Sequence, residues 1–208
     1  MNTQSGRSMV EMLGVLAIIG VLSVGAIAGY SKAMMKYKLN QHAVAVNMLI
    51  NNVLSVKDKL QHTEELTHYG TLLYKLNLLP DGIEYIRNNL LQDKWFKGDT
   101  WIYYYNFQAP REPFGGIGFR VPPTAQGAEI CRNIALAAKE NAANLYYVVM
   151  QKAFNDTNKD VEYQGILYGD AYCTQQNCLR HLDLNKIDNM CNNCNEKKCQ
   201  VYVIWKQT

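Results

Sequence analysis

The chain has 208 residues, a formal net charge of +3 and an isoelectric point of about 8.4. Its lysines and arginines are scattered, so it lacks the basic surface of a nucleic-acid-binding protein and gives no indication of a nucleic-acid partner. The six cysteines all lie beyond residue 130, and an even number in an exported chain favours up to three disulfides.

An apolar run without a charged side chain extends over residues 12–31. At about 1.5 Å of rise per residue, a helix of this length crosses the roughly 30 Å hydrocarbon core of a bilayer. Glu11 is the carboxylate at its edge, and a six-residue polar leader, residues 1–6, ends in Gly6. A secretory signal has a basic start, a shorter apolar run and a cleavage site after it. We therefore expect residues 7–31 to be retained as a transmembrane helix.

The charges that flank this span and the cysteines predict opposite orientations. Lys32, Lys36 and Lys38 follow the span and outnumber Arg7 and the amino terminus before it. The positive-inside rule then favours a cytoplasmic C-terminal part. The cysteine number favours export of the same part. We give the cysteines precedence and predict an extracytoplasmic domain behind one membrane span.

Residues 32–62 are expected to continue the helix in amphipathic form. The first proline is Pro80, so no proline interrupts a helix that begins near Ser8. Apolar residues at steps of three or four mark one helical face: Met35, Leu39, Ala43, Val46, Leu49, Val53, Val56 and Leu60. This pattern predicts packing on the chain's own globular domain. A free coiled coil is the alternative, but charged e and g partners are not systematic.

Residues 63–208 are expected to form one α+β head. Short helices are predicted at residues 69–79 and, after a Pro80-Asp81-Gly82 turn, at 83–91. Strand-forming residues at 101–107 and 116–121 predict an antiparallel pair.

The C-terminal part of the head is expected to add a helix and two strands. An alanine-rich helix is predicted from an N-cap at Thr124 to about Lys152, with one apolar face that includes Leu145 and Val149. A turn at residues 155–158 and strands at 162–168 and 200–205 follow, with a cysteine-rich region between the strands.

The N-terminus resembles that of type IV prepilins. In that family a short leader ends in glycine, a prepilin peptidase cleaves after it, and a glutamate recurs at the fifth mature position. Gly6, Arg7 and Glu11 occupy these places. Arg7 stands where the family usually has an apolar residue, and no basic residue precedes Gly6. The resemblance implies cleavage after Gly6 and methylation of the new amine.

The head is similar to those of type IVb pilins. Residues 76–81, residues 93–98 and the tyrosine-rich strand after them follow the order of short helix, proline turn and tryptophan-glycine segment seen in that group. Residues 118–122 lead similarly into the helix that carries Cys131. The resemblance implies the type IV pilin-like α+β fold: a long N-terminal helix, half in the membrane and half amphipathic, packed on an antiparallel sheet head with disulfides.

A structural subunit is the function that these resemblances imply. Such a subunit is held in the inner membrane by a single span and then polymerises through its N-terminal helix into a helical homo-oligomer, the extracellular pilus. Its partners are the prepilin peptidase, membrane lipid and the inner-membrane pilus assembly machinery. Adhesion, motility, DNA uptake or secretion are roles of the polymer. The alternatives are a minor pilin or pseudopilin of a secretion or DNA-uptake machine, and an anchored extracytoplasmic binding or redox domain that does not polymerise.

A carboxylate at the membrane edge has a physical use in such a polymer. Ionisable groups in membrane segments are costly without a partner and usually mark function. Cleavage after Gly6 leaves an α-amine four residues before Glu11, and one subunit's Glu11 can pair with the amine of its neighbour. The alternative is that Glu11 snorkels to the interface without a role. Four glycines permit close helix approach: Gly14, Gly20, Gly25 and Gly29.

No enzyme motif, metal or cofactor is predicted. The disulfide candidates are Cys131, Cys173, Cys178, Cys191, Cys194 and Cys199. Four of them also allow a zinc site, and the Cys191-x2-Cys194 pair a redox site, but export favours disulfides. Six cysteines allow fifteen pairings, and we expect Cys131 to pair with a C-terminal cysteine across the helix and last strand. Trp95, Trp101 and the tyrosines suit sheet core and inter-subunit surface, with sugar binding as the alternative.

Overall fold

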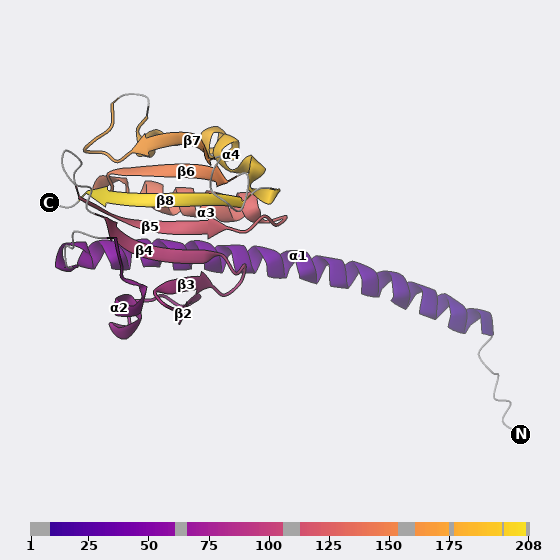
Figure 1. The fold of residues 1–208 in the computed structure, drawn as a ribbon. Helices are drawn as coiled ribbons and strands as arrows, with labels where there is room; N and C mark the ends of the chain where they lie inside the picture. The colour runs from indigo at the N-terminus through magenta and orange to yellow at the C-terminus, as the bar shows by residue number, and fades with distance from the viewer. Residues whose placement is uncertain are drawn as a thin grey trace, which may run out of the picture. The chain divides into compact units, whose positions relative to one another are not determined.

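The computed structural model describes residues 9–60, 66–105, 113–153, 161–174, 177–196 and 198–206 (Figure 1). The chain divides into two compact units, residues 1–38 and 39–208. Helix α1 (Met9–Val56) runs through the first unit and supplies the first element of the second. The predicted uninterrupted N-terminal helix is therefore confirmed. Gly6, Arg7 and the predicted turn at residues 155–158 lie outside the described residues.

The second unit is built on one antiparallel sheet. Its strands are β1 (Thr67–His68), β2 (Ile83–Arg87), β3 (Leu90–Asp93), β4 (Asp99–Tyr105), β5 (Phe114–Val121), β6 (Tyr147–Ala153), β7 (Val161–Tyr168) and β8 (Lys198–Lys206). The strand order is β2-β3-β4-β5-β8-β6-β7, and β1 pairs with β4. Figure 1 shows the last strand, β8, inserted between β5 and β6. The C-terminal strand is thus central and paired on both sides.

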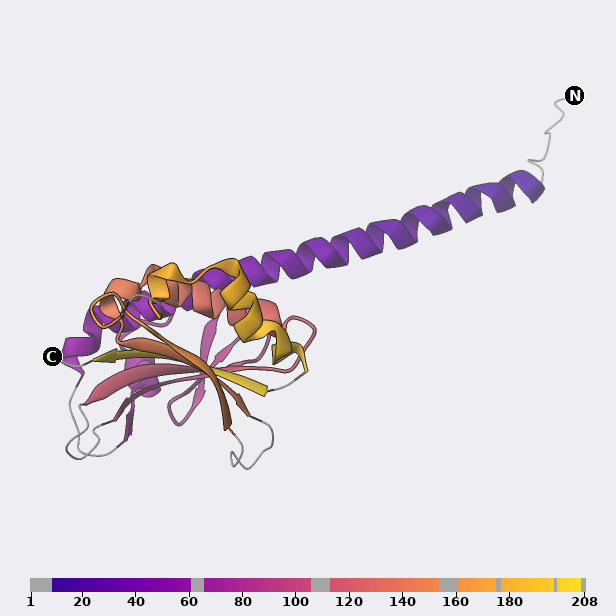
Figure 2. The same ribbon diagram turned by 90° about the horizontal axis from the view of Figure 1, so that it is seen from above.

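Helices cover one face of this sheet. They are the residues of α1 from 39 onward, α3 (Gly127–Glu140) and α4 (Leu184–Cys191), which Figure 2 shows on the same side. The remaining helices are α2 (Gly70–Lys75) and the short 3-10 helices η1 (Lys57–Lys59), η2 (Ala142–Asn144), η3 (Leu179–His181) and η4 (Asn192–Asn195). The fold is α+β with a long N-terminal helix and three disulfides, as predicted, and it fits a pilin-like architecture.

The head part of α1 packs through the predicted apolar stripe. Val46, Leu49 and Val53 are buried in the core. Ala45 and Ile50 are buried as well, so the contact is one row of side chains wider than the periodicity indicated. Burial of a large apolar side chain gains about 1.5–3 kcal/mol relative to exposure, so this face fixes the helix on the sheet.

The predicted helix over residues 83–91 is wrong, because this segment forms the β2–β3 hairpin. Arg87 pairs with Leu90, which leaves Asn88 and Asn89 as a two-residue turn. Both have positive φ, 47° and 65°. Two-residue hairpin turns of type I′ require positive φ at both positions, and asparagine tolerates that conformation better than most residues. The adjacent Pro80-Asp81-Gly82 turn is confirmed, with Gly82 at φ 97°.

The predicted helix over residues 124–152 is also wrong at both ends. Helix α3 begins after Gln126 and ends at Glu140, and residues 147–153 are strand β6. Val149 lies in β6, where β-branched and aromatic residues suit a pleated strand. Its neighbours Val148 and Met150 belong to the core cluster and Val149 does not, as the alternation of side chains along a strand requires. The predicted pairing of β4 with β5, and the strands that became β7 and β8, are confirmed.

Replacement of Leu49 by alanine tests the packing of α1 on the head. Leu49 is fully buried, whereas its neighbour Met48 is 48% exposed. We expect Leu49→Ala to lower the free energy of unfolding by about 2–5 kcal/mol. Met48→Ala, the matched control, should change it by less than about 0.5 kcal/mol. Urea unfolding of the full chain in detergent, followed by tryptophan fluorescence, measures both. Equal effects of the two variants would contradict the packing described.

Candidate functional site

The first part of α1 exposes apolar side chains on all sides. This helix is long and apolar enough to cross a membrane, and no residue of its most apolar stretch is buried in the described structure. The large exposed side chains are Met9, Met12, Leu13, Val15, Leu16, Ile18, Ile19, Val21, Leu22, Val24, Ile27 and Tyr30. A helix that is apolar around its whole circumference belongs in a lipid or protein environment. The segment therefore suggests a membrane anchor.

Glu11 lies at one edge of the apolar stretch and Lys32 at the other. Glu11 is exposed in the first turn of the described helix, where the helix dipole favours a negative charge by about 0.3–1 kcal/mol. The rise from Glu11 to Lys32 is about 32 Å in a regular helix, close to the thickness of a hydrocarbon core. The charged positions thus have the spacing of the two membrane boundaries.

Four glycines interrupt the apolar side chains of this stretch. A Cβ atom added at Gly14, Gly20, Gly25 or Gly29 would meet no atom within 4 Å in the described structure. Each glycine in a helix interior costs about 1 kcal/mol relative to alanine. Described parts of the chain therefore provide no packing reason for these glycines. Small residues do serve to bring neighbouring helices close together in membranes.

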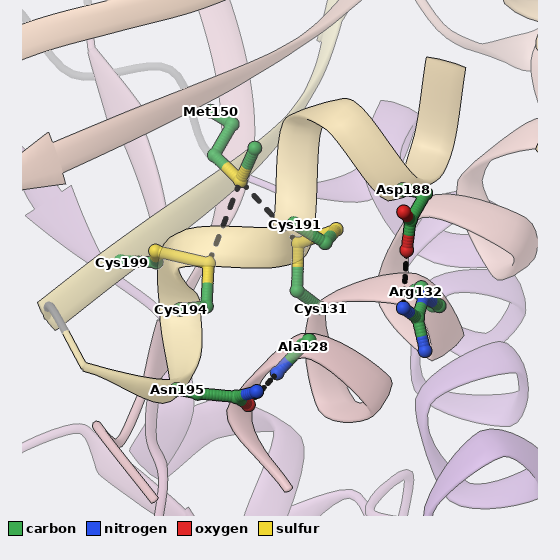
Figure 3. Close-up of a disulfide and its surroundings, with 9 residues drawn as sticks. All are labelled: Ala128, Cys131, Arg132, Met150, Asp188, Cys191, Cys194, Asn195 and Cys199. Atoms are coloured by element: carbon green, nitrogen blue, oxygen red, sulfur yellow. Dashed lines mark hydrogen bonds and ion pairs between the residues drawn. A yellow bond between two sulfur atoms is a disulfide. The ribbon is translucent and has the colours of Figure 1, made fainter. Parts of the chain in front are cut away.

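All six predicted cysteines are paired. Figure 3 shows the disulfides Cys131–Cys191 and Cys194–Cys199, and the third disulfide is Cys173–Cys178. Cys131 pairs with a C-terminal cysteine as expected, but that partner lies in α4 and not in the last strand. Cys191 and Cys194 belong to different disulfides, so they do not form the alternative redox pair. No group of three potential metal ligands occurs among the described residues.

Two of the disulfides, Cys131–Cys191 and Cys194–Cys199, lie where α3, α4, η4 and β8 meet strand β6. The Met150 sulfur contacts Cys131 Sγ at 3.3 Å and Cys194 Sγ at 4.0 Å, and because disulfide sulfurs carry no proton these are van der Waals contacts (Figure 3). The Asn195 side chain accepts a hydrogen bond from the Ala128 backbone N–H at 2.8 Å. This bond satisfies a backbone donor at the start of α3. The predicted N-cap was Thr124, but α3 begins after Gln126. The cysteine-rich region therefore holds the helical layer together.

A buried histidine lies in the α1 contact. His42 and Asp93 are each 3% exposed. His42 Nδ1 is 3.3 Å from the Asn133 side-chain nitrogen, and its ring meets the Phe96 ring edge to face. Asp93 accepts hydrogen bonds from three backbone N–H groups, at 3.0, 2.9 and 3.4 Å. Burial lowers the pKa of His42, and the Asp93 carboxylate opposes that shift. His42 belongs to the packing of the head.

The predicted aromatic cluster is largely sheet packing. The Trp101 ring lies where a Cβ at Gly118 would be, and it meets Tyr202 edge to face at 6.0 Å. Tyr103 meets the same Tyr202 at 6.4 Å, and burial raises the pKa of Tyr103. Trp95 occupies the space above Gly82. Each ring thus compensates for a nearby glycine or packs on another ring, and Trp101, Tyr103 and Tyr202 lie outside the buried core.

A groove on the head was not predicted from the sequence. It has a volume of about 320 Å³ and lies between the edge strand β7 and helix α4. Its walls include Ile166, Met190 and Lys186. A volume of this size is at the lower end of the range for small-molecule sites.

No protein-family model, curated protein or solved structure matches this chain. The membership of a family is therefore not shown, and function is inferred from the residues and the geometry. The described features with functional meaning are the exposed apolar helix, Glu11 at its start and the disulfide-bonded head.

Removal of single disulfides tests the role of the cysteine-rich region. The Cys131–Cys191 bond spans 60 residues, whereas Cys173–Cys178 spans 5. In the chain-entropy account, removal of the long-range bond costs about 4 kcal/mol and removal of the short-range bond about 2 kcal/mol. We expect Cys131→Ala/Cys191→Ala to lower the free energy of unfolding more than Cys173→Ala/Cys178→Ala. Urea titration of both double variants measures this, and the reverse order would count against the described junction.

Acidification should destabilise the head through His42. Because burial lowers its folded-state pKa below the ordinary value of 6.5, the unfolded chain binds this proton more readily. Stability is then complete above the unfolded pKa and is lost as the pH falls toward the folded one. We expect His42→Gln to reduce the loss of unfolding free energy between about pH 7.5 and about pH 5.5. His181→Gln, at an exposed histidine, is the control and should lose as much unfolding free energy on acidification as the unaltered chain does.

Proposed function

We propose that this protein is a structural subunit of a type IV pilus, made as a membrane-anchored precursor that is cleaved after Gly6. Its apolar helices bundle into the core of a helical filament, and its disulfide-bonded heads form the surface. In this proposal the role is structural and not catalytic. Inner-membrane residence precedes assembly, and the assembled subunit is extracellular.

The observation that supports the proposal is the contrast between the two parts of α1. Beyond residue 39 the helix buries one face in the head, with Leu49, Ile50 and Val53 fully covered. Before residue 31 the same helix is apolar on all sides and uncovered in the described structure. A chain of this kind needs lipid first, and an equivalent apolar environment if it leaves the membrane. A bundle of identical apolar helices provides that environment without any further protein.

Glu11 gives the bundle a means of alignment. Cleavage after Gly6 would place a positive α-amine four residues before Glu11. In a bundle of parallel helices, the Glu11 carboxylate of one subunit pairs with the amine of its neighbour. Charges inside an apolar bundle are costly unless they are paired, so this pairing sets the axial offset between subunits. Gly14, Gly20, Gly25 and Gly29 permit the close helix approach that the bundle requires.

The proposed partners are those that act on the subunit before and during assembly. A prepilin peptidase would remove residues 1–6 and expose Arg7, and methylation of the new amine is implied by the same resemblance. The inner-membrane pilus assembly machinery would move the subunit from lipid into the homo-oligomeric filament. A minor pilin or a pseudopilin of a secretion or DNA-uptake machine would use the same anchor and head.

A second candidate is an anchored extracytoplasmic binding domain that does not polymerise. The groove between β7 and α4 favours it, because a volume of about 320 Å³ bordered by Ile166, Met190 and Lys186 accommodates a small ligand. This candidate uses the apolar helix as a permanent anchor and assigns no role to Glu11.

Substitution of Glu11 separates the two candidates. We expect Glu11→Gln to abolish surface filaments, because the neutral amide leaves the neighbouring amine without an opposite charge. Glu129→Gln is the matched control, because Glu129 is also exposed in the first turn of a helix, α3. Electron microscopy of cells expressing each variant, with the subunit in shed fibres identified by mass, is the measurement.

The head must remain folded for the result to be informative. Near-UV circular dichroism and urea unfolding of purified Glu11→Gln should match the unaltered chain, since Glu11 lies outside the second unit. Filaments of normal number and length in Glu11→Gln cells would contradict the pairing. Absence of fibres from the unaltered chain, in cells that assemble other pilins, would favour the anchored binding domain.

A further inference from the structure

Three lysines follow the apolar stretch of α1 within seven residues. Lys32 and Lys36 are exposed, and Lys38 is partly exposed. None of the three has an ion pair among the described residues. The sequence contains no aspartate or glutamate between Glu11 and Asp58, so α1 itself provides no carboxylate near them. The positive charge at this level is uncompensated within the first unit.

Two exposed tyrosines accompany these lysines. Tyr30 is 66% exposed and Tyr37 57% exposed. Successive helical residues turn by about 100°, so the two tyrosines lie close to one side and Lys32 and Lys36 on the opposite side, with Lys38 between. The five residues thus form a girdle around the helix. Tyrosine rings and lysine side chains are the groups that occupy the membrane–water interface.

The axial position of this girdle matches a headgroup layer. From Tyr30 to Lys38 a helix rises by about 12 Å, enough to traverse the polar layer of one leaflet. The girdle begins where the uncharged stretch of residues 12–31 ends. Lysine ammonium groups at this level lie among lipid phosphates.

We propose that Lys32, Lys36 and Lys38 form a binding surface for the headgroups of anionic phospholipids in the non-cytoplasmic leaflet. The inference rests on the proposed membrane anchoring and not on polymerisation. Charge complementarity selects the lipid. A parallel neighbouring helix has no carboxylate between Glu11 and Asp58, and along the helix axis these two lie about 30 Å or more from each of the three lysines, so the helix offers no partner at this level. The surface also gives these lysines a role on the side of the membrane where the positive-inside rule disfavours them.

Lipid retention by the full chain tests this binding surface. The uncleaved chain is inserted into vesicles of equal parts phosphatidylcholine and phosphatidylglycerol, extracted in mild detergent, and the bound lipids are counted by native mass spectrometry. A lysine near an anionic surface contributes about fivefold in affinity, so we expect phosphatidylglycerol to be enriched by at least about tenfold. Lys32→Gln/Lys36→Gln/Lys38→Gln should remove that enrichment. High salt during extraction should weaken it in the unaltered chain.

A matched variant controls for total charge. Lys59→Gln/Lys75→Gln/Lys97→Gln removes the same charge from exposed positions of the head and should keep the enrichment. Equal lipid retention by the unaltered chain and the Lys32, Lys36 and Lys38 variant would overturn the proposal. Loss of enrichment in the head variant would overturn it too, because net charge alone would then explain binding.

The outcome is distinguishable from a failure of the proposed function. Resistance of the chain to carbonate extraction from the vesicles reports anchoring directly. An extractable chain would overturn anchoring and the lipid surface together. A chain that resists extraction and enriches phosphatidylglycerol but forms no filaments in cells would leave the lipid surface standing and count against polymerisation alone.

Discussion

The uncharged stretch of α1 needs an apolar environment that the described remainder of its chain does not supply. Each large side chain gains about 1.5–3 kcal/mol on leaving water, and a dozen of them surround the helix axis between Met9 and Tyr30. The rest of the chain is arranged consistently with this constraint. The helix continues into the head, where one face is buried under the sheet, and charges stand at both ends of the stretch, Glu11 before it and Lys32 after it. Three disulfides cross-link the head.

Much of the fold was predictable because its strongest elements follow simple periods. The apolar stripe of α1 and the strand-forming runs of β4, β5, β7 and β8 appear where expected. The failures have a common physical cause. Leu145 and Val149 continue a helical spacing from α3 by coincidence, because Leu145 enters the core around α3 whereas Val149 lies in strand β6, whose core residues are Val148 and Met150. The β2–β3 hairpin depends on positive φ at Asn88 and Asn89, which apolar periodicity does not reveal.

In the candidate site, features that follow from composition were predictable from the sequence, and features that depend on packing were not. The span and the cysteines were identifiable from sequence because length, hydropathy and cysteine number are properties of composition. The pairing of Cys131 with Cys191 depends on the packing of α3 against α4 and is one of many possibilities in the sequence. The burial of His42 was not predictable from the sequence, because the residues beside it, Asp93 and Asn133, come from distant segments. The groove beside β7 likewise requires the sheet order.

In the proposed assembly the apolar helix begins as an anchor and ends as the core of a polymer, and this requires removal of the leader. The decisive measurement is the mass of the intact protein, both in membranes and in fibres sheared from the cell surface. We expect the subunit in fibres to begin at Arg7, and the membrane fraction to contain this form together with the uncleaved precursor. A chain that retains Met1 in all fractions, in cells whose prepilin peptidase is active on another substrate, would contradict it.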